Sequence, residues 1–398
     1  MRSTVAVIDF GTSKISTLIT ENNHNQRCDI IGAGVINYHG YCDGEWMDSN
    51  NVNEALAQSI AEAEKQSKRK ITEIYVGIPG AFATVLTIET SISIQVSETK
   101  ITYNHVNKLI EQAKKSLPTL SGPIIYSSPA WFMVDGSRKT LEPVGKKGSE
   151  LRGLISFVVA DPFFIEDVAS RFRNLNIEVV GSFCTCTAEA LLYLSEIDRD
   201  RMAVLIDVGY LNTNISIVEG DALLFLATLP IGGAHISAQL ASELQIHFDQ
   251  AEQIKREYIY SVANIVREYS ASTQEGYTPN IFTQQEIANV LEPVVDNLAE
   301  QIKETIKNSN IKLGSYSKYF LTGGGIALNR GGKDYLAMKL KPAELSIVEK
   351  RTNKLSSPAF SSIMGLTALV MDTLENNANN DHDTLSKIKN FFNNLFGI

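Results

Sequence analysis

A motif that occurs twice constrains the fold of this 398-residue chain more than any other feature. In each copy an apolar run ends in an aspartate, and a glycine follows two residues later, at residues 9–11 and again at residues 207–209. The apolar runs show no polar alternation, so each predicts a strand that is covered on both faces. A second strand follows each turn. Because a repeated motif is a much stronger indication than a single copy, we expect two lobes of matching architecture.

The first turn has the chemistry that a phosphate and its metal ion require. Gly11 allows an unusual backbone angle, Thr12, Ser13 and Lys14 supply donors, and Asp9 offers a carboxylate to a cation held through water. The Walker spacing of glycines and lysine is absent. Taken alone, the motif is also compatible with an ordinary hairpin turn. Two such turns, one in each lobe, predict a clamp for one nucleotide.

Composition limits the class of protein. The net charge of −9 argues against wholesale nucleic-acid binding, which normally leaves a basic footprint. The length predicts two or more domains, and we expect a cytoplasmic protein because no signal peptide and no membrane-spanning apolar run is present. The four cysteines form no disulfide framework. Cys184 and Cys186 could contact a metal, but we expect two small residues buried beside a helix start.

The order of expected elements is that of an actin-like protein rather than of a Rossmann unit. The first lobe opens with strands at 5–10, 15–20 and 30–36, a helix at 52–66 capped by Asn51 or Asn53, and a strand at 74–78. Prolines and glycines then punctuate a strand at 85–94, a helix at 103–116 and several short strands. A strand at 153–159, a helix at 162–175 and a strand at 177–180 lead back to the first lobe.

The second lobe repeats the meander and adds helices and glycines. We expect strands at 202–207, 215–218, 222–229 and 319–322, helices at 249–258, 284–307 and 358–374, and a loosely structured excursion at 260–284. Gly233 opens a further helix whose bare backbone donors suit a phosphate. Gly323, Gly324 and Gly325 allow close approach to a flat ligand. Glu252 and Lys255 lie one turn apart, and a surface ion pair is the alternative interpretation.

The end of the chain differs from the rest. A polar linker at 375–384 precedes a segment at 385–398 that is amphipathic on a helix, a pattern typical of a helix lying in a membrane interface. The alternative is a helix that folds back on the protein. The expected membrane face consists of Leu385, Ile388, Phe391, Phe392, Leu395 and Phe396.

These motifs, in this order, resemble those of the bacterial cell-division protein family FtsA, within the actin, Hsp70 and sugar-kinase superfamily. The resemblance lies in residues 9–14, 187–190, 207–209, 230–233, 251–255, 321–325 and 362–365. It implies an α/β, actin-like two-lobed ATPase fold with a family-specific inserted subdomain and a C-terminal amphipathic helix. The implied divisions are 1–81 with 157–200 and 356–374 for the first lobe, 82–156 for the insertion, 201–230 with 308–355 for the second lobe core, and 231–307 for its small subdomain.

The resemblance also implies ligands and partners. The cofactors would be ATP and Mg²⁺, with Asp9 and Asp207 holding the metal through water and Asp207 also serving as the catalytic residue. The implied nucleotide-binding residues are Gly11, Thr12, Ser13, Lys14, Gly209, Asn212, Gly233, Glu252, Lys255, Gly323, Gly324 and Gly325. The family polymerises and anchors the tubulin-like protein FtsZ, whose C-terminal peptide would dock on residues 231–307. Other divisome proteins would also bind, at the cytoplasmic face of the cell membrane and at the division site.

The second turn departs from the family pattern. Tyr210 and Leu211 replace small residues and would hinder close backbone approach, and Asn214 removes a charge. We therefore expect ATP binding with slow or absent hydrolysis. Two other functions of the same superfamily compete with this interpretation, a pilus-type assembly adaptor and a small-molecule kinase. The kinase would need a carboxylate base that the sequence does not offer clearly.

Overall fold

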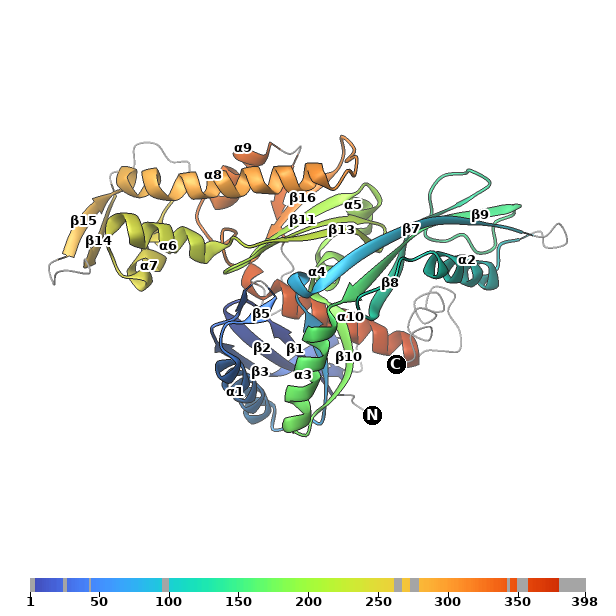
Figure 1. Cartoon of the computed structure of the whole chain (residues 1–398), viewed down its shortest axis with the longest axis horizontal. Coiled ribbons are helices and arrows are strands. Elements are labelled where there is room, and N and C mark those ends of the chain that lie inside the picture. Colours follow the sequence, from blue (N-terminus) through green and yellow to red (C-terminus); the bar gives the residue numbers. More distant parts are fainter. Residues whose placement is uncertain are drawn as a thin grey trace. The chain divides into compact units, whose positions relative to one another are not determined.

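The computed structural model describes residues 4–23, 27–42, 44–94, 100–260, 267–272, 279–341, 344–348 and 357–378 (Figure 1). The chain divides into two compact units. The first unit comprises Met1–Met202, Ser216–Leu226 and Ser362–Ile398, and the second comprises Ala203–Ile215 and Ala227–Ser361. Each unit contains one of the two aspartate turns.

A five-stranded sheet forms the centre of the first unit. Its strand order is β10-β6-β1-β2-β3, in which β1 runs antiparallel to β2 and parallel to β6. The bounds are β1 (Thr4–Phe10), β2 (Lys14–Asn23), β3 (Arg27–Asn37), β6 (Glu73–Ile78) and β10 (Glu178–Cys184). Helices α1 (Ser49–Ser67) and α3 (Pro162–Asn174) contribute their apolar residues to the core of this sheet. The sheet therefore holds β1 by neighbours on both edges, which fixes the position of Asp9.

Helix α1 begins earlier than its expected cap. The N-cap is Asp48, whose carboxylate accepts from the backbone N–H groups of Asn50 and Asn51 at 3.0 and 3.1 Å. The prediction of Asn51 or Asn53 as the cap is therefore wrong. Glycines in β3 let the helix approach the sheet: a Cβ at Gly34 would lie 1.9 Å from the backbone oxygen of Ser59.

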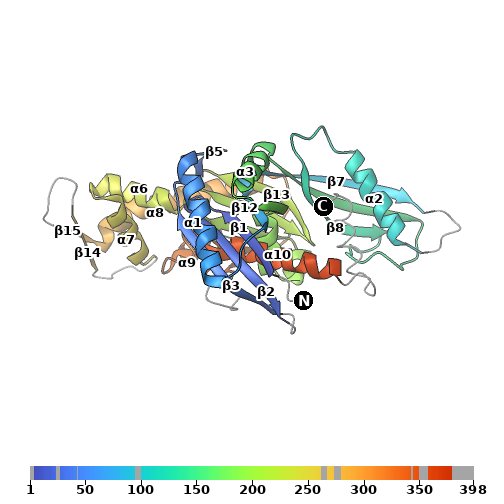
Figure 2. The ribbon, with the colours of Figure 1, turned by 90° about the horizontal axis from the view of Figure 1, so that it is seen from below.

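A three-stranded antiparallel sheet with the order β7-β9-β8 follows in the first unit (Figure 2). Its elements are β7 (Ala83–Ser93), α2 (Tyr103–Lys115), β8 (Ile124–Val134) and β9 (Glu150–Ala160). Two long strands thus replace the several short ones expected, because Pro129 lies at an irregularity of β8 without ending it. The strand expected at 153–159 belongs to this sheet over its whole length and does not return to the first sheet.

The smaller elements of the first unit complete it. They are β4 (Tyr41–Cys42), β5 (Glu45–Trp46), a 3₁₀ turn (Gly80–Phe82), α4 (Thr185–Tyr193), α5 (Glu196–Asp200) and α10 (Ser361–Ala378). Helix α10 passes very close to α4, since a Cβ at Gly365 would lie 2.7 Å from the backbone nitrogen of Glu189. The first turn of α10 thereby reaches the end of β1, where Ser362 contacts Asp9.

The second unit is built on parallel strands. Strand β11 (Ala203–Val208) pairs in parallel with β16 (Lys318–Thr322), which pairs in parallel with β17 (Leu345–Ile347). The sheet order is β13-β12-β11-β16-β17, with β12 (Thr213–Glu219) and β13 (Ala222–Leu229) following β11 along the chain. The helices are α6 (Gly233–Leu244), α7 (Phe248–Glu257), α8 (Gln284–Asn308) and α9 (Gly332–Leu340), and α6 packs against α7 and α8 (Figure 1).

The segment at 260–284 and the start of the last helix differ from the expectations. The excursion expected at 260–284 contains an antiparallel hairpin of β14 (Glu268–Ser272) and β15 (Pro279–Thr283), so it is not loosely structured throughout. A short 3₁₀ turn (Pro358–Phe360) precedes α10. The amphipathic segment at 385–398 and most of the linker lie outside the described residues. Within the described part of the chain, no helix is long and apolar enough to span a membrane.

Candidate functional site

The first turn is a tight one that links β1 to β2. The Gly11 N–H donates to the backbone oxygen of Lys14 at 3.0 Å, and β2 begins at that residue. Gly11 is not among the described residues with positive φ, so the prediction of an unusual backbone angle is wrong. Space limits this position instead, because a Cβ would lie 3.2 Å from the Lys14 oxygen. Thr12 is buried, whereas Ser13 and Lys14 are half-buried.

Two residues before α1, Tyr38 and Gly40, contact this turn, and the sequence interpretation missed them. The Tyr38 hydroxyl donates to the Gly11 oxygen at 2.7 Å, and the Tyr38 N–H donates to the Ser13 oxygen at 3.0 Å. Burial, with a smaller effect of Asp9, raises the pKa of Tyr38, so this hydroxyl stays protonated and able to donate. Gly40 has φ +83°, and a Cβ there would lie 2.1 Å from the Thr12 oxygen. Gly40, which lies between the third strand and the first helix, was the one sequence signal that could have indicated this contact.

Asp9 is the penultimate residue of β1 and is 6% exposed. Its Oδ2 accepts a hydrogen bond of 2.6 Å from the hydroxyl of Ser362 in the first turn of α10. Burial raises the pKa of Asp9, and the Ser362 hydrogen bond and the Lys14 charge offset only part of that effect. The structure thus presents a desolvated carboxylate that a cation would stabilise. The sequence interpretation did not predict this contact of Ser362.

The second turn repeats the first. Asp207 is the penultimate residue of β11, and the Gly209 N–H donates to the Asn212 oxygen at 2.9 Å, as Gly11 does to the residue three positions on. The Asp207 carboxylate is half-buried and its Oδ2 accepts from Asn214 Nδ2 at 3.4 Å. The Asn214 oxygen accepts from the Thr228 hydroxyl at 2.8 Å. Asn214, which stands where a charged residue was expected, is therefore hydrogen-bonded to both Asp207 and Thr228.

The glycines of the second unit converge on this second turn. A Cβ at Gly323, which has φ +87°, would lie 2.2 Å from the Val208 oxygen and 2.3 Å from Asp207 Oδ1. The Gly325 N–H donates to the same Val208 oxygen at 2.7 Å. Two glycines of the triple thus serve backbone packing, and Gly324, the exposed one, is left to approach a ligand.

The start of α6 differs from the prediction. The Gly233 N–H donates to the Gly209 oxygen at 2.9 Å, and the Ala234 N–H donates to the Tyr210 oxygen at 2.8 Å. These two backbone donors are therefore not bare, and the prediction that they face a phosphate is wrong for this arrangement. Gly233 instead allows contact with the glycine triple, because its Cβ would lie 2.8 Å from the Gly325 Cα.

Glu252 and Lys255 form an ion pair in which the lysine is buried and the glutamate half-buried, rather than the surface pair considered as the alternative. Lys255 Nζ donates to Glu252 Oε2 at 2.6 Å and to the Gly233 oxygen at 2.9 Å, which ties α7 to the glycine cluster. Burial lowers the pKa of Lys255, and the charge of Glu252 offsets part of that effect. Burial alone would raise the pKa of Glu252, but Lys255, Ser237 and Arg256 together lower it. The carboxylate is therefore ionised.

Cys184 and Cys186 lie at the start of α4. Cys184 is the N-cap, and both thiols are 1% exposed. A hydrogen bond from Cys186 is the main cause that lowers the pKa of Cys184 to about 7. The cysteines are buried beside a helix start, in agreement with the interpretation as small buried residues.

Each turn offers a single carboxylate, which suits Mg²⁺ better than it suits a metal whose ligands all come from protein. Within the described ranges, no three His, Cys, Asp or Glu side chains gather as a metal site. Mg²⁺ commonly uses one or two carboxylates and takes its other ligands from water and phosphate. Asp9 in the first unit and Asp207 in the second each offer such a carboxylate.

Comparison with known proteins identifies the relatives of this chain. The family model described as cell division protein FtsA matches residues 204–365, which include the second turn and the glycine triple. Cell division protein FtsA of Borreliella burgdorferi is 24% identical over 334 residues, or 83% of this chain and 79% of that protein. FtsA of Pseudomonas aeruginosa is 22% identical over 90% of this chain and 87% of that protein. The chain is thus similar to FtsA proteins over most of its length, at low sequence identity. The resemblance to the FtsA family is thus confirmed.

Solved structures share the fold of this chain. A chain of the PilM–PilN type IV pilus biogenesis complex matches with a TM-score of 0.62 at 15% identity, covering 93% of this chain and 99% of that one. MreB5 of Spiroplasma citri bound to ADP matches with a TM-score of 0.57 at 14% identity, covering 95% and 98%. The predicted α/β, actin-like fold is confirmed. The expected C-terminal helix lies outside the described residues.

Proposed function

We propose that the chain is an ATP-binding, membrane-tethered, actin-like protein of bacterial cell division, which polymerises and anchors FtsZ to the cytoplasmic face of the membrane at the division site. The observation that carries the most weight is the repeated turn: an aspartate one residue before the strand end, then a glycine whose N–H closes the turn. The similarity to cell division proteins named FtsA supplies the cellular role.

Both turns would bind the phosphates of one nucleotide. Thr12, Ser13 and Lys14 of the first unit would donate to phosphate oxygens, and Gly209 and Asn212 of the second unit would also contact phosphate. Asp9 and Asp207 would hold Mg²⁺ through water, which supplies positive charge beside the phosphates. A relative of the same fold was solved with bound ADP, which supports this assignment.

The remaining nucleotide-binding residues lie in the second unit. Glu252 and Lys255 would approach the ribose and base, together with Gly324 and its two neighbours. The ion pair of α7 is fixed to the backbone of Gly233, so it is rigid before any ligand arrives. A preorganised site loses less conformational entropy on binding.

We propose that hydrolysis is slow or absent, although Asp207 would be the catalytic residue if turnover occurs. The Tyr210 oxygen accepts from Ala234 and the Asp207 carboxylate accepts from Asn214, so both are engaged in contacts within the second unit. A water attacking the terminal phosphate would need a group to orient it. The bound state would therefore persist.

Membrane attachment would come from the terminal segment at 385–398, which carries five large apolar residues and Phe396 on one face. A single tail of this size binds reversibly, since each large side chain contributes roughly 1.5–3 kcal/mol only at full burial. Several tails on one polymer bind much more firmly through effective concentration. Polymerisation and membrane attachment would thus support one another, and FtsZ would dock on the small subdomain at 231–307.

Liposome co-sedimentation tests the proposal. Full-length protein with Mg²⁺-ATP should pellet with liposomes and bring FtsZ with it, whereas protein lacking residues 385–398 should leave both in the supernatant. The double substitution Phe391→Asp with Phe392→Asp should also prevent pelleting. Its matched control is Asn393→Asp with Asn394→Asp on the polar side of the same segment, which should still pellet. Equal pelleting of the truncated protein, or pelleting without FtsZ, would contradict membrane anchoring or FtsZ recruitment, respectively.

The pilus-type adaptor is the competing outcome of this test. The match to the PilM–PilN complex is at 15% identity and concerns the fold alone, so it does not favour that role. A peptide from the N-terminus of a pilus assembly protein, titrated beside the FtsZ C-terminal peptide, separates the two functions. Preference for the pilus peptide would overturn the proposed role.

A further inference from the structure

Strand β7 lies at an edge of the three-stranded sheet and leaves one side of its backbone open. It pairs with β9 along all 11 residues, and no described strand pairs with its other side. The Ser91 oxygen faces that open side, where it accepts from Gln112 Nε2 of α2 at 3.1 Å. Ile94, three residues on, faces the other way and donates to the Ser149 oxygen at 2.7 Å.

The direction of these bonds identifies which backbone groups a partner could use. In an antiparallel strand both backbone groups of one residue point to the same side, and the side alternates along the strand. Glu89 and Ser93 therefore share the outward direction of Ser91. An edge strand of this length is a ready template for pairing with another extended chain.

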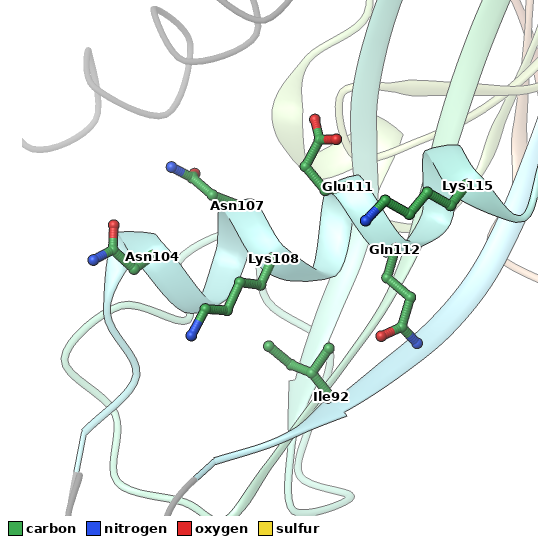
Figure 3. A pocket seen from close by; sticks show the side chains of 7 residues that line it. All are labelled: Ile92, Asn104, Asn107, Lys108, Glu111, Gln112 and Lys115. Carbon is green, nitrogen blue, oxygen red and sulfur yellow. The ribbon is translucent and has the colours of Figure 1, made fainter.

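A hollow of about 600 Å³ adjoins the end of this edge. It is lined by Ile92 of β7 and by six polar residues of α2 (Figure 3). Lys108 and Gln112 point from the helix toward the end of β7, whereas Glu111 points the other way (Figure 3). The hollow therefore combines one apolar contact with cationic and amide donors.

The surroundings of the hollow are basic. Lys108 and Lys115 form no ion pair within the part of the chain that the structure describes. Glu89, the one acidic residue of β7, is already paired with Arg152. Residues 82–160 contain nine Lys and Arg against six Asp and Glu, although the whole chain carries a net charge of −9. The charge of this region thus complements an acidic ligand.

We propose that the open edge of β7 and the adjoining hollow bind an extended acidic peptide of a partner protein. The peptide adds to the sheet as a strand along β7, and a backbone N–H replaces Gln112 at the Ser91 oxygen. Its carboxylates pair with Lys108 and Lys115, and one apolar side chain packs on Ile92. Backbone pairing supplies affinity, and the lysines select the charge of the peptide.

Fluorescence anisotropy tests this surface with two labelled probes on the full-length protein. One probe is a seven-residue peptide of alternating glutamate and valine, and the other has lysine in place of glutamate. We expect the acidic probe to bind and the lysine probe to bind at least about tenfold more weakly. Lys108→Glu with Lys115→Glu should weaken binding of the acidic probe by at least about tenfold, while the exposed pair Lys307→Glu with Lys312→Glu should leave it unchanged.

Two further variants separate strand addition from simple attraction of charge. Ser91→Pro removes an outward N–H without removing a bond to β9, so it should abolish binding. Gln112→Ala frees the Ser91 oxygen without disturbing the backbone, so binding should be equal or tighter. Equal binding of both probes, or unchanged binding by Ser91→Pro together with weaker binding by Gln112→Ala, would overturn the proposal. Concentration-dependent self-association that Ser91→Pro abolishes, without probe binding, would assign the edge to a second copy and overturn it as well.

Discussion

At the scale of single residues, Asp9 and Asp207 end equivalent strands in different surroundings. Asp9 is buried and accepts from the Ser362 hydroxyl, whereas Asp207 is half-buried and accepts from the Asn214 amide. Burial raises the pKa of Asp9. A carboxylate in this state gains most from a nearby cation. The first turn is therefore the stronger candidate for holding Mg²⁺, as the sequence interpretation also had it.

The substitution Asp9→Asn should make the ligand-free protein more stable at neutral pH. The raised pKa means that the native state binds a proton more tightly than the unfolded chain, so wild-type stability rises as the pH falls through the folded pKa. The uncharged variant should therefore be more stable than the wild type at pH 7, and the difference should vanish as the pH falls to 3.8. Urea unfolding across this range measures it, and a variant less stable than wild type at pH 7 would contradict the assignment.

The substitution Gly40→Ala should disrupt the first turn, and Gly44→Ala is its matched control. Both glycines have positive φ, +83° and +81°, but only a Cβ at Gly40 meets another atom, the Thr12 oxygen at 2.1 Å. Backbone strain alone should lower the free energy of unfolding by about 1–2 kcal/mol in Gly44→Ala. Gly40→Ala should lose about 1–3 kcal/mol more and should weaken nucleotide binding. Similar stability losses in the two variants, measured by urea unfolding, would show that Gly40 does not support the turn.

At the scale of secondary-structure elements, the close passage of α10 over α4 positions Ser362 beside Asp9. Gly365→Ala would place a Cβ 2.7 Å from the backbone nitrogen of Glu189. We expect a loss of about 1–3 kcal/mol in thermal or urea unfolding, despite the better helix propensity of alanine. Gly314→Ala, where the nearest atom would be 3.9 Å away, should change stability little. An equal effect of the two substitutions would contradict a tight crossing.

The sequence predicted most elements because their signals are local. Uninterrupted apolar runs identified β1 and β11, and apolar spacing identified α1. Pro129 misled the interpretation, since a proline at a strand irregularity does not end the strand. The cap of α1 was also not predictable, because residues 48–51 all have side chains that can cap a helix.

The site was less predictable because its contacts join residues far apart in the sequence. Ser362 donates to Asp9 across more than 350 positions, and no local pattern indicates that bond. The Gly233 N–H is taken by the Gly209 oxygen, which lies on a separate turn. Two glycines before a helix indicate backbone N–H groups that can bind a ligand only when no other backbone oxygen accepts from those groups. The residue types of the site were predicted, but their partners were not.

At the scale of the whole molecule, each compact unit carries one turn of the same construction. The first unit adds Ser362, Tyr38 and Gly40 around its turn, and the second adds Asn214 and the glycine cluster. The similarity to FtsA covers most of the chain, and the actin-like fold is shared with a protein solved with ADP. The binding of one nucleotide with Mg²⁺ is a proposal, and the proposed membrane anchoring and polymerisation depend on it.

Isothermal titration of the full-length protein with ATP, with and without Mg²⁺, tests that claim most directly. We expect one nucleotide per chain, binding that depends on Mg²⁺, and a loss of at least about tenfold in affinity for Asp9→Asn and for Asp207→Asn. Asp334→Asn, at an exposed aspartate of α9, is the control and should bind as the wild type does. No binding by the wild type, or equal affinity in all three variants, would contradict the account.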